Sequence, residues 1–141
     1  MSRRRALILV LLLVVLGVGV LRPRWVKRRA MQAQERELAY QFALRSYSEA
    51  LKLGISRKDV EDYLRGKSKA FSQRCCMEQA RSNAWDDLTK IGEERSPWYC
   101  SKHNVYIGFA FVSTESHFVP EAHDSDTLTA VTIFHAMEGC L

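Results

Sequence analysis

The chain has 141 residues, which is room for one globular domain. Its formal net charge of +5 is unevenly spread: residues 1–36 carry nine Lys/Arg and one acidic residue, whereas residues 37–141 carry twelve Lys/Arg and fifteen acidic residues. The positive charge therefore belongs to the N-terminal segment, and the sequence indicates no nucleic-acid partner.

An apolar run near the N-terminus predicts a membrane segment. Residues 6–21, ALILVLLLVVLGVGVL, contain no charged or polar side chain and follow three arginines. The interpretation is an uncleaved signal-anchor over residues 1–24, localised to the cell inner membrane as a single-pass protein. As a helix the sixteen residues span roughly 24 Å, short of the ~30 Å of a typical hydrocarbon core. A cleaved signal peptide is the alternative, with Gly17-Val18-Gly19 as its best small-residue site.

Basic residues and a tryptophan follow the apolar run. They are expected either to lie at the membrane interface against lipid head groups or to be solvated charges. The set consists of Arg22, Arg24, Trp25, Lys27, Arg28 and Arg29. Their number favours a cytoplasmic C-terminal domain by the positive-inside rule, whereas the cysteines favour the opposite side.

The cysteines predict disulfide bonds in an extracytoplasmic, periplasmic domain. Cys75, Cys76, Cys100 and Cys140 are an even set without C-x-x-C or zinc-ligand spacing. Because adjacent cysteines rarely bond to each other, we expect each bridge to join one of Cys75 and Cys76 to Cys100 or Cys140. A cytoplasm-facing thiol redox protein is an alternative interpretation.

Helical patterns precede and follow Gly54. Residues 25–38 are predicted to form a juxtamembrane helical linker, and residues 39–141 are expected to form a domain. The domain begins with a predicted helix that runs to about Leu53. Its apolar face repeats with helical spacing at Tyr40, Ala43, Leu44, Tyr47 and Leu51. A second helix is predicted with Ser56 as N-cap, Asp59 as a short capping-box acid and Gly66 as terminator. Together they form a predicted helical hairpin.

The segment from Gly54 to Gly66 carries a family resemblance. A helix, then G-[IM]-[ST]-x-x-[DQ]-V-x-x-[YL]-L ending in glycine, then strands, resembles the small-protein-A/outer-membrane lipoprotein fold of β-lactamase-inhibitor proteins. The matching positions are Gly54, Ser56, Val60, Leu64 and Gly66. The resemblance implies protein–protein binding or assembly rather than catalysis. The chain lacks that family's lipidated cysteine, and as a whole it also resembles uncharacterised small membrane-anchored bacterial proteins.

The sequence of the C-terminal half predicts an antiparallel sheet. Residues 103–113 alternate with both faces apolar or small, which is typical of a covered central strand, and residues 127–135 are expected to pair with them. Residues 69–77 predict another strand, and residues 83–95 fit either a short helix or a strand. The predicted fold class is α+β, a helical hairpin packed on a small antiparallel sheet.

The loop at residues 114–126, TESHFVPEAHDSD, is the candidate for metal chemistry. His117, His123 and Asp124 are weak candidate ligands, since the two histidines lie six apart around a proline, and an acidic solvated loop is favoured. His103 gives only a lone C-x-x-H with Cys100, and His135 is interpreted as an ordinary strand-end residue. A metal-binding sensor or enzyme using this loop is an alternative function.

No catalytic motif is present in the sequence, so no catalytic residue and no cofactor are assigned. Trp98, Tyr99 and Trp85 are either core residues or an exposed patch for a partner. The favoured function is a membrane-anchored, extracytoplasmic protein–protein binding module, an envelope assembly factor or inhibitor, with membrane lipid and an envelope protein as partners.

Overall fold

A computed structural model describes the backbone of residues 3–75, 83–115, 117 and 119–141, and the side chains of these residues from Trp25 onwards. The chain divides into two compact units, Met1–Ala39 and Tyr40–Leu141. The fold is α+β, with two helices and a four-stranded antiparallel sheet among the described residues. The predicted fold class is thereby confirmed at this level.

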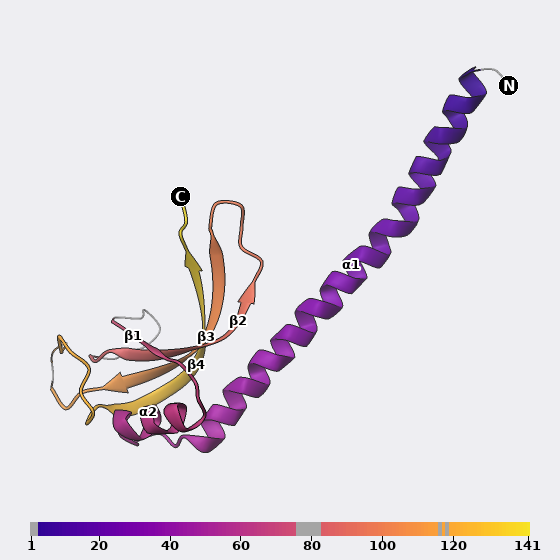
Figure 1. The fold of residues 1–141 in the computed structure, drawn as a ribbon. Coiled ribbons are helices and arrows are strands. Elements are labelled where there is room, and N and C mark those ends of the chain that lie inside the picture. Colours follow the sequence, from indigo (N-terminus) through magenta and orange to yellow (C-terminus); the bar gives the residue numbers. More distant parts are fainter. Residues whose placement is uncertain (1–2, 76–82, 116, 118) are drawn as a thin grey trace. The chain divides into compact units, whose positions relative to one another are not determined.

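The helices precede the sheet in the chain (Figure 1). The helices are α1 (Arg3–Ala50) and α2 (Arg57–Gly66), and the strands are β1 (Ser72–Arg74), β2 (Asp86–Glu94), β3 (Lys102–Val112) and β4 (Thr127–Glu138). The strands pair in the order β1-β2-β3-β4, each antiparallel to its neighbour. The predicted pairing of residues 103–113 with 127–135 is confirmed, and the ambiguous segment 83–95 contains a strand.

Helix α2 has the predicted N-cap, Ser56, whereas Gly66 is its last helical residue and the left-handed residue that follows the helix is Ser68, with φ 54°. The Ser56 side chain accepts a hydrogen bond from the Asp59 backbone N–H at 3.2 Å, and its hydroxyl donates to Asp59 Oδ2 at 2.7 Å. Gly54, in the turn before the helix, has φ +91°, a conformation that glycine adopts without a side-chain penalty. Backbone N–H groups of Arg57 and Lys58 donate to carbonyls of Asp126 and Asp124, so the β3–β4 loop completes the helix start.

One face of the sheet packs on the helices. Ile107 and Phe109 of β3 share a buried cluster with Tyr47 and with Val60 and Leu64 of α2. The ring of Tyr47 stands edge-on to that of Phe109, with centroids 5.5 Å apart. This burial explains why β3 is apolar on the face towards the helices. Its opposite face contributes Tyr106 to a smaller cluster.

The sheet bends, because pairing shifts between Lys90 and Gly92 of β2 and between Ala110 and Phe111 of β3. Figure 1 shows the hairpin that joins β2 and β3 rising away from α2, with the C-terminus beside its top. The bend therefore separates the helix-packed part of the sheet from a projecting end.

The expected single-pass inner-membrane localisation is contradicted. Within the part of the chain that the structure describes, no helix contains an apolar stretch long enough to cross a membrane. A spanning helix needs about 20 consecutive apolar residues, more than the sixteen of the run at residues 6–21. That run has helical backbone within α1, and its side chains lie outside the described residues.

Candidate functional site

The projecting end of the β2–β3 hairpin is closed against the C-terminal segment. We call residues 95–101 and 139–141 the tip. A disulfide joins Cys100 to Cys140, the Leu141 N–H donates to Tyr99 O at 2.9 Å, and the Ser101 N–H donates to Glu138 O at 3.0 Å. Covalent and backbone bonds together fix the two segments of the tip to each other.

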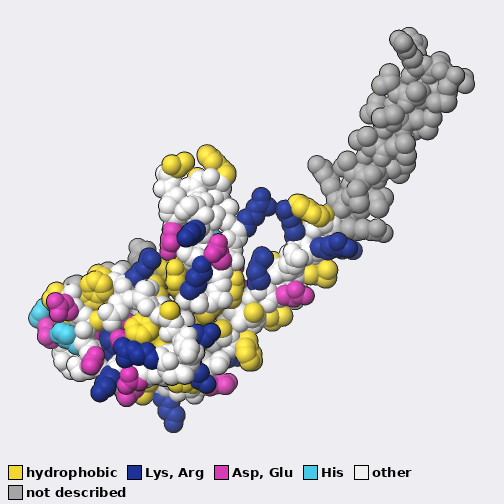
Figure 2. All heavy atoms as spheres, in the orientation of Figure 1, with side chains coloured by type: hydrophobic (Ala, Val, Ile, Leu, Met, Phe, Trp, Pro, Cys, Tyr) yellow, Lys and Arg dark blue, Asp and Glu magenta, His cyan; other side chains and the backbone are white. Residues whose placement is uncertain are grey.

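The tip presents aromatic side chains to solvent. Trp98 is 91% exposed and Tyr99 is 43% exposed, and their rings meet edge-on with centroids 5.8 Å apart. Leu141 is also exposed, as is Met137 near the end of β4. Figure 2 shows hydrophobic side chains gathered at the top of this projection, above a band of charged side chains.

The third predicted partner-binding residue, Trp85, lies away from Trp98 and Tyr99. It precedes β2, whereas they follow it, and a nine-residue strand spans about 30 Å. Trp85 is half-buried, and its carbonyl accepts a hydrogen bond from Arg57. The structure therefore brings together two of the three predicted residues, and Trp85 belongs to a polar cluster.

The cysteine pairing corrects the sequence prediction. Cys100 bonds to Cys140 rather than to Cys75 or Cys76. The antiparallel meander accounts for this pairing, because it places the start of β3 beside the end of β4, where Lys102 pairs with Glu138. Cys75 is also disulfide-bonded, and Cys76 lies outside the described residues. No described cysteine is a free thiol, as the redox alternative would require.

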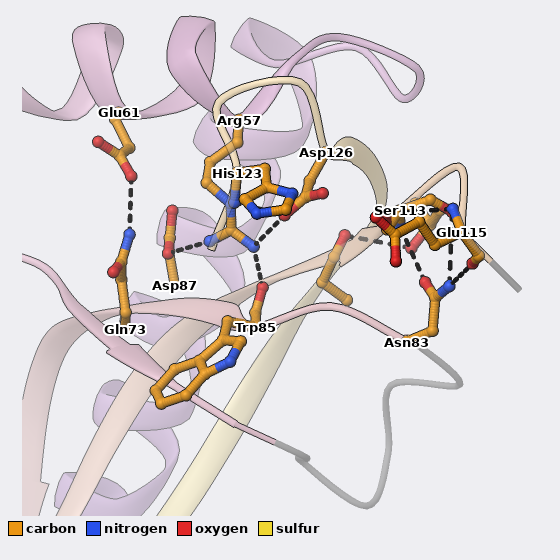
Figure 3. Close-up of polar contacts among 12 residues, drawn as sticks. Arg57, Glu61, Gln73, Asn83, Trp85, Asp87, Ser113, Glu115, His123 and Asp126 are labelled. Carbon is orange, nitrogen blue, oxygen red and sulfur yellow. Dashed lines mark hydrogen bonds and ion pairs between the residues drawn. The ribbon is translucent and has the colours of Figure 1, made fainter. Parts of the chain in front are cut away.

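A buried ion cluster joins α2, β2 and the β3–β4 loop (Figure 3). Arg57 Nη1 donates to Asp87 Oδ1 at 2.6 Å, Arg57 Nη2 donates to Asp126 Oδ2 at 3.3 Å, and the guanidinium lies 4.0 Å from the centre of the Phe111 ring. All three charged side chains are almost completely buried. Burial raises the pKa of Asp87 to about 7, although the neighbouring Arg57 opposes the shift. The pairing of each charge indicates a structural role.

The candidate ligands of the 114–126 loop do not form a common cluster in the structure. His117 Nε2 lies 3.0 Å from Glu115 Oε2, with both side chains exposed. The backbone N–H of His123 donates to Asp126 Oδ2 at 3.0 Å, beside the buried ion cluster in Figure 3. Asp124 contributes its carbonyl to the start of α2. The Asn83 side chain bonds backbone groups of Ser113 and Glu115, holding the loop from the β2 side.

Three other side chains do converge, on the helix-facing side of the sheet. One candidate ligand atom from each of Glu94, His103 and His135 lies within 4.8 Å of the other two. Among the described residues, no other set of three or more His, Cys, Asp or Glu side chains comes this close together. Glu94 pairs with His103 across β2 and β3, and His135 pairs with Val105, two positions along from His103. Sequence reasoning missed this group because its members come from three strands. The signal was present in the predicted antiparallel pairing, which brings residues 103 and 135 close.

The residues predicted for the membrane interface lie in the first unit. Arg29 Cζ lies 3.3 Å from the centre of the Trp25 ring, a cation–π contact. Trp25, Lys27, Arg28 and Arg29 are exposed, and the side chains of Arg22 and Arg24 lie outside the described residues.

Comparison with known proteins yields no match to a protein family, a curated protein or a solved structure. The resemblance of residues 54–66 to the small-protein-A fold stays a prediction.

Proposed function

We propose that this chain is a non-catalytic protein-binding module and that its tip contacts the partner protein. The supporting observation is Trp98, a residue that is 91% exposed although its side chain is large and mostly apolar. Tryptophan and tyrosine are enriched among residues that carry most of the binding energy at protein interfaces. The pair Trp98 and Tyr99 therefore suits a binding anchor.

The closed geometry of the tip strengthens this proposal. A side chain held on a fixed backbone loses less conformational entropy on binding than one on a mobile loop. The Cys100–Cys140 disulfide and the hydrogen bond from the Leu141 N–H to Tyr99 O fix the backbone after the aromatic pair, and the Cys100 N–H donates to Pro97 O at 3.1 Å across the pair. Trp98 is thus presented in a preorganised position.

The chemistry of the tip defines the partner. Residues 96–101, SPWYCS, carry no charge, and Arg95 and Lys102 flank them. A complementary protein surface would contain an apolar pocket for the indole ring, with acidic side chains at its rim to face the two bases.

Site-specific photo-crosslinking in the producing cell tests the proposal. A photoreactive phenylalanine analogue replaces Trp98 in one variant and Leu53 in a matched control, because Leu53 is also exposed, at 65%, and lies in the turn before α2. We expect a single protein adduct of defined mass from position 98 and none of that mass from position 53. A partner that binds through the tip is then identified directly.

Two results would contradict the proposal. One is the absence of any defined protein adduct at position 98, and the other is the same adduct pattern from both positions. Trp98→Ala serves as a folding control, because truncation of so exposed a side chain should change the free energy of unfolding by no more than about 0.5 kcal/mol.

A further inference from the structure

We propose that Glu94, His103 and His135 form a binding site for a divalent transition-metal ion of the Zn²⁺ class. Glu94 is the last residue of β2, His103 lies near the start of β3 and His135 lies near the end of β4. The antiparallel register places all three on the same face of the sheet. Three consecutive strands therefore each contribute one ligand, which gives the site a rigid base.

His103 shows the feature that points to a missing ligand. Its side chain is only 14% exposed, and its Nε2 atom is buried without a hydrogen-bond partner. Its Nδ1 atom lies 3.7 Å from Glu94 Oε2, which is too far for a hydrogen bond. A cation held between the ring and the carboxylate would bond Nδ1 and bring Glu94 and His103 together, whereas the buried Nε2 is a separate polar atom that this cation does not reach.

The distances suit a site that closes around an ion. Candidate ligand atoms lie within 4.8 Å of one another, and the rings of His103 and His135 have centroids 5.5 Å apart. Zinc–nitrogen bonds of about 2.0–2.1 Å require ligand atoms to approach to roughly 3.5 Å in a tetrahedral site. The exposed His135 side chain leaves the ion an access path from solvent, and a change of its side-chain rotamer is the movement that closure requires.

Neighbouring residues help to fix the ligands. The ring of Tyr40 stands edge-on to His135, with centroids 6.5 Å apart. A Cβ atom at Gly92 would lie 2.7 Å from Tyr40 Oη, so glycine at this position lets Tyr40 pack closely on the sheet. Tyr40 thereby limits the positions that the His135 ring can adopt.

The ligand set selects the class of ion. Two imidazole nitrogens and one carboxylate suit Zn²⁺, Co²⁺ or Ni²⁺, whereas Ca²⁺ and Mg²⁺ favour sites made wholly of oxygen ligands. Three protein ligands leave a fourth position for water or for another ligand. The site does not depend on the partner proposed for the tip.

Isothermal titration of the purified, oxidised full chain with Zn²⁺ tests this site. We expect one ion per chain and no binding of Ca²⁺ under the same conditions. His135→Ala should weaken Zn²⁺ binding by at least about tenfold, the lower range seen even for residues that only support metal ligands. Because His135 is exposed, this variant should keep its fold, and His103→Ala provides a second test of the same site.

A double variant of the exposed loop histidines, His117→Ala with His123→Ala, is the matched control and should bind Zn²⁺ as the parent chain does. Co²⁺ gives an independent readout, since its visible absorption should show nitrogen ligands in the parent chain and lose that signature in His135→Ala. The proposal is overturned if the parent chain binds no Zn²⁺, if His135→Ala binds it equally well, or if only the loop variant loses binding.

Discussion

Arg57 Nη1 lies 2.6 Å from Asp87 Oδ1, and both side chains are almost fully buried. Arg57 also contacts Asp126 and the backbone carbonyl of Trp85, so one guanidinium connects α2, β2 and the β3–β4 loop. These contacts fix the helix-packed part of the sheet, from which the hairpin carrying the tip projects. The ion cluster therefore stabilises the part of the domain from which the tip projects, and it is not part of the tip.

Removal of Arg57 should destabilise the domain strongly. Arg57→Met keeps much of the apolar stem and leaves the carboxyls of Asp87 and Asp126 buried without their cation. Breaking a buried ion pair in this way costs about 3–5 kcal/mol in free energy of unfolding, measurable by urea denaturation. Lys90→Met is the control, because Lys90 pairs with Glu93 at 2.9 Å and both side chains are exposed, so its loss should matter far less. An equal decrease in the free energy of unfolding in the two variants would show that the buried ion cluster stabilises the domain no more than an exposed ion pair does.

Stability should fall as pH rises towards neutrality, through Asp87. Burial raises the pKa of Asp87 from its ordinary 3.8 to about 7 in the folded chain. Between those values the folded state binds more protons than the unfolded state, so the contribution of Asp87 is fully present at low pH and is lost as pH rises through about 7. The free energy of unfolding should therefore be greater at about pH 5 than at about pH 8, and Asp87→Asn should flatten that difference.

Two other carboxyls have shifted pKa values, and they affect stability only below this pH range. Hydrogen bonds from Lys90 and from Asn104 lower the pKa values of Glu93 and Glu138 below their ordinary 4.5, so their stabilising effect is lost only in more acidic solution. Glu93→Gln should leave the slope between about pH 5 and pH 8 unchanged, because the pKa of Glu93 is lowered below its ordinary 4.5. An identical slope in Asp87→Asn and in the parent chain would refute the assignment to Asp87.

Loss of the Cys100–Cys140 disulfide should lower the free energy of unfolding by about 2–4 kcal/mol, because the bridge restricts the unfolded chain across a sequence separation of 40 residues. The variant with both cysteines replaced by serine can be compared with the parent chain by urea denaturation. A difference below about 0.5 kcal/mol would mean that the bridge contributes little to stability.

The Ser56 cap should contribute about 1 kcal/mol to the free energy of unfolding. Ser56→Ala removes the acceptor of the Asp59 N–H hydrogen bond at the start of α2. Ser46→Ala is the matched control, since Ser46 is an exposed position within α1, and it should change stability by no more than about 0.5 kcal/mol. Similar effects of the two substitutions would argue against a capping role.

Local patterns predicted the elements that local physics determines. Alternation of strong β-formers marked β3 and β4, and the cap at Ser56 marked the start of α2. The strand β2 stayed ambiguous because Leu88 and Ile91 fit a helical repeat as well as a strand, and burial between β1 and β3 decides in favour of the strand.

Contacts between distant residues were not predicted. The Cys100–Cys140 bond depends on strand register rather than on cysteine spacing. Arg57 and Asp126 are 69 positions apart, and no local pattern marks them as partners. His103 and His135 looked unremarkable singly, because their proximity is a property of the β3–β4 pairing. Trp98 and Tyr99 could be named because an aromatic pair in a short loop is visible in the sequence itself.

The affinity of the tip for the protein identified by crosslinking tests the central claim most directly. The dissociation constants of the parent chain, Trp98→Ala and the control Leu53→Ala can be measured by titration calorimetry. An anchor worth at least about 2 kcal/mol predicts roughly thirtyfold weaker binding for Trp98→Ala, with Leu53→Ala unchanged. Equal affinity for the parent chain and Trp98→Ala would contradict the claim that the tip is the binding surface.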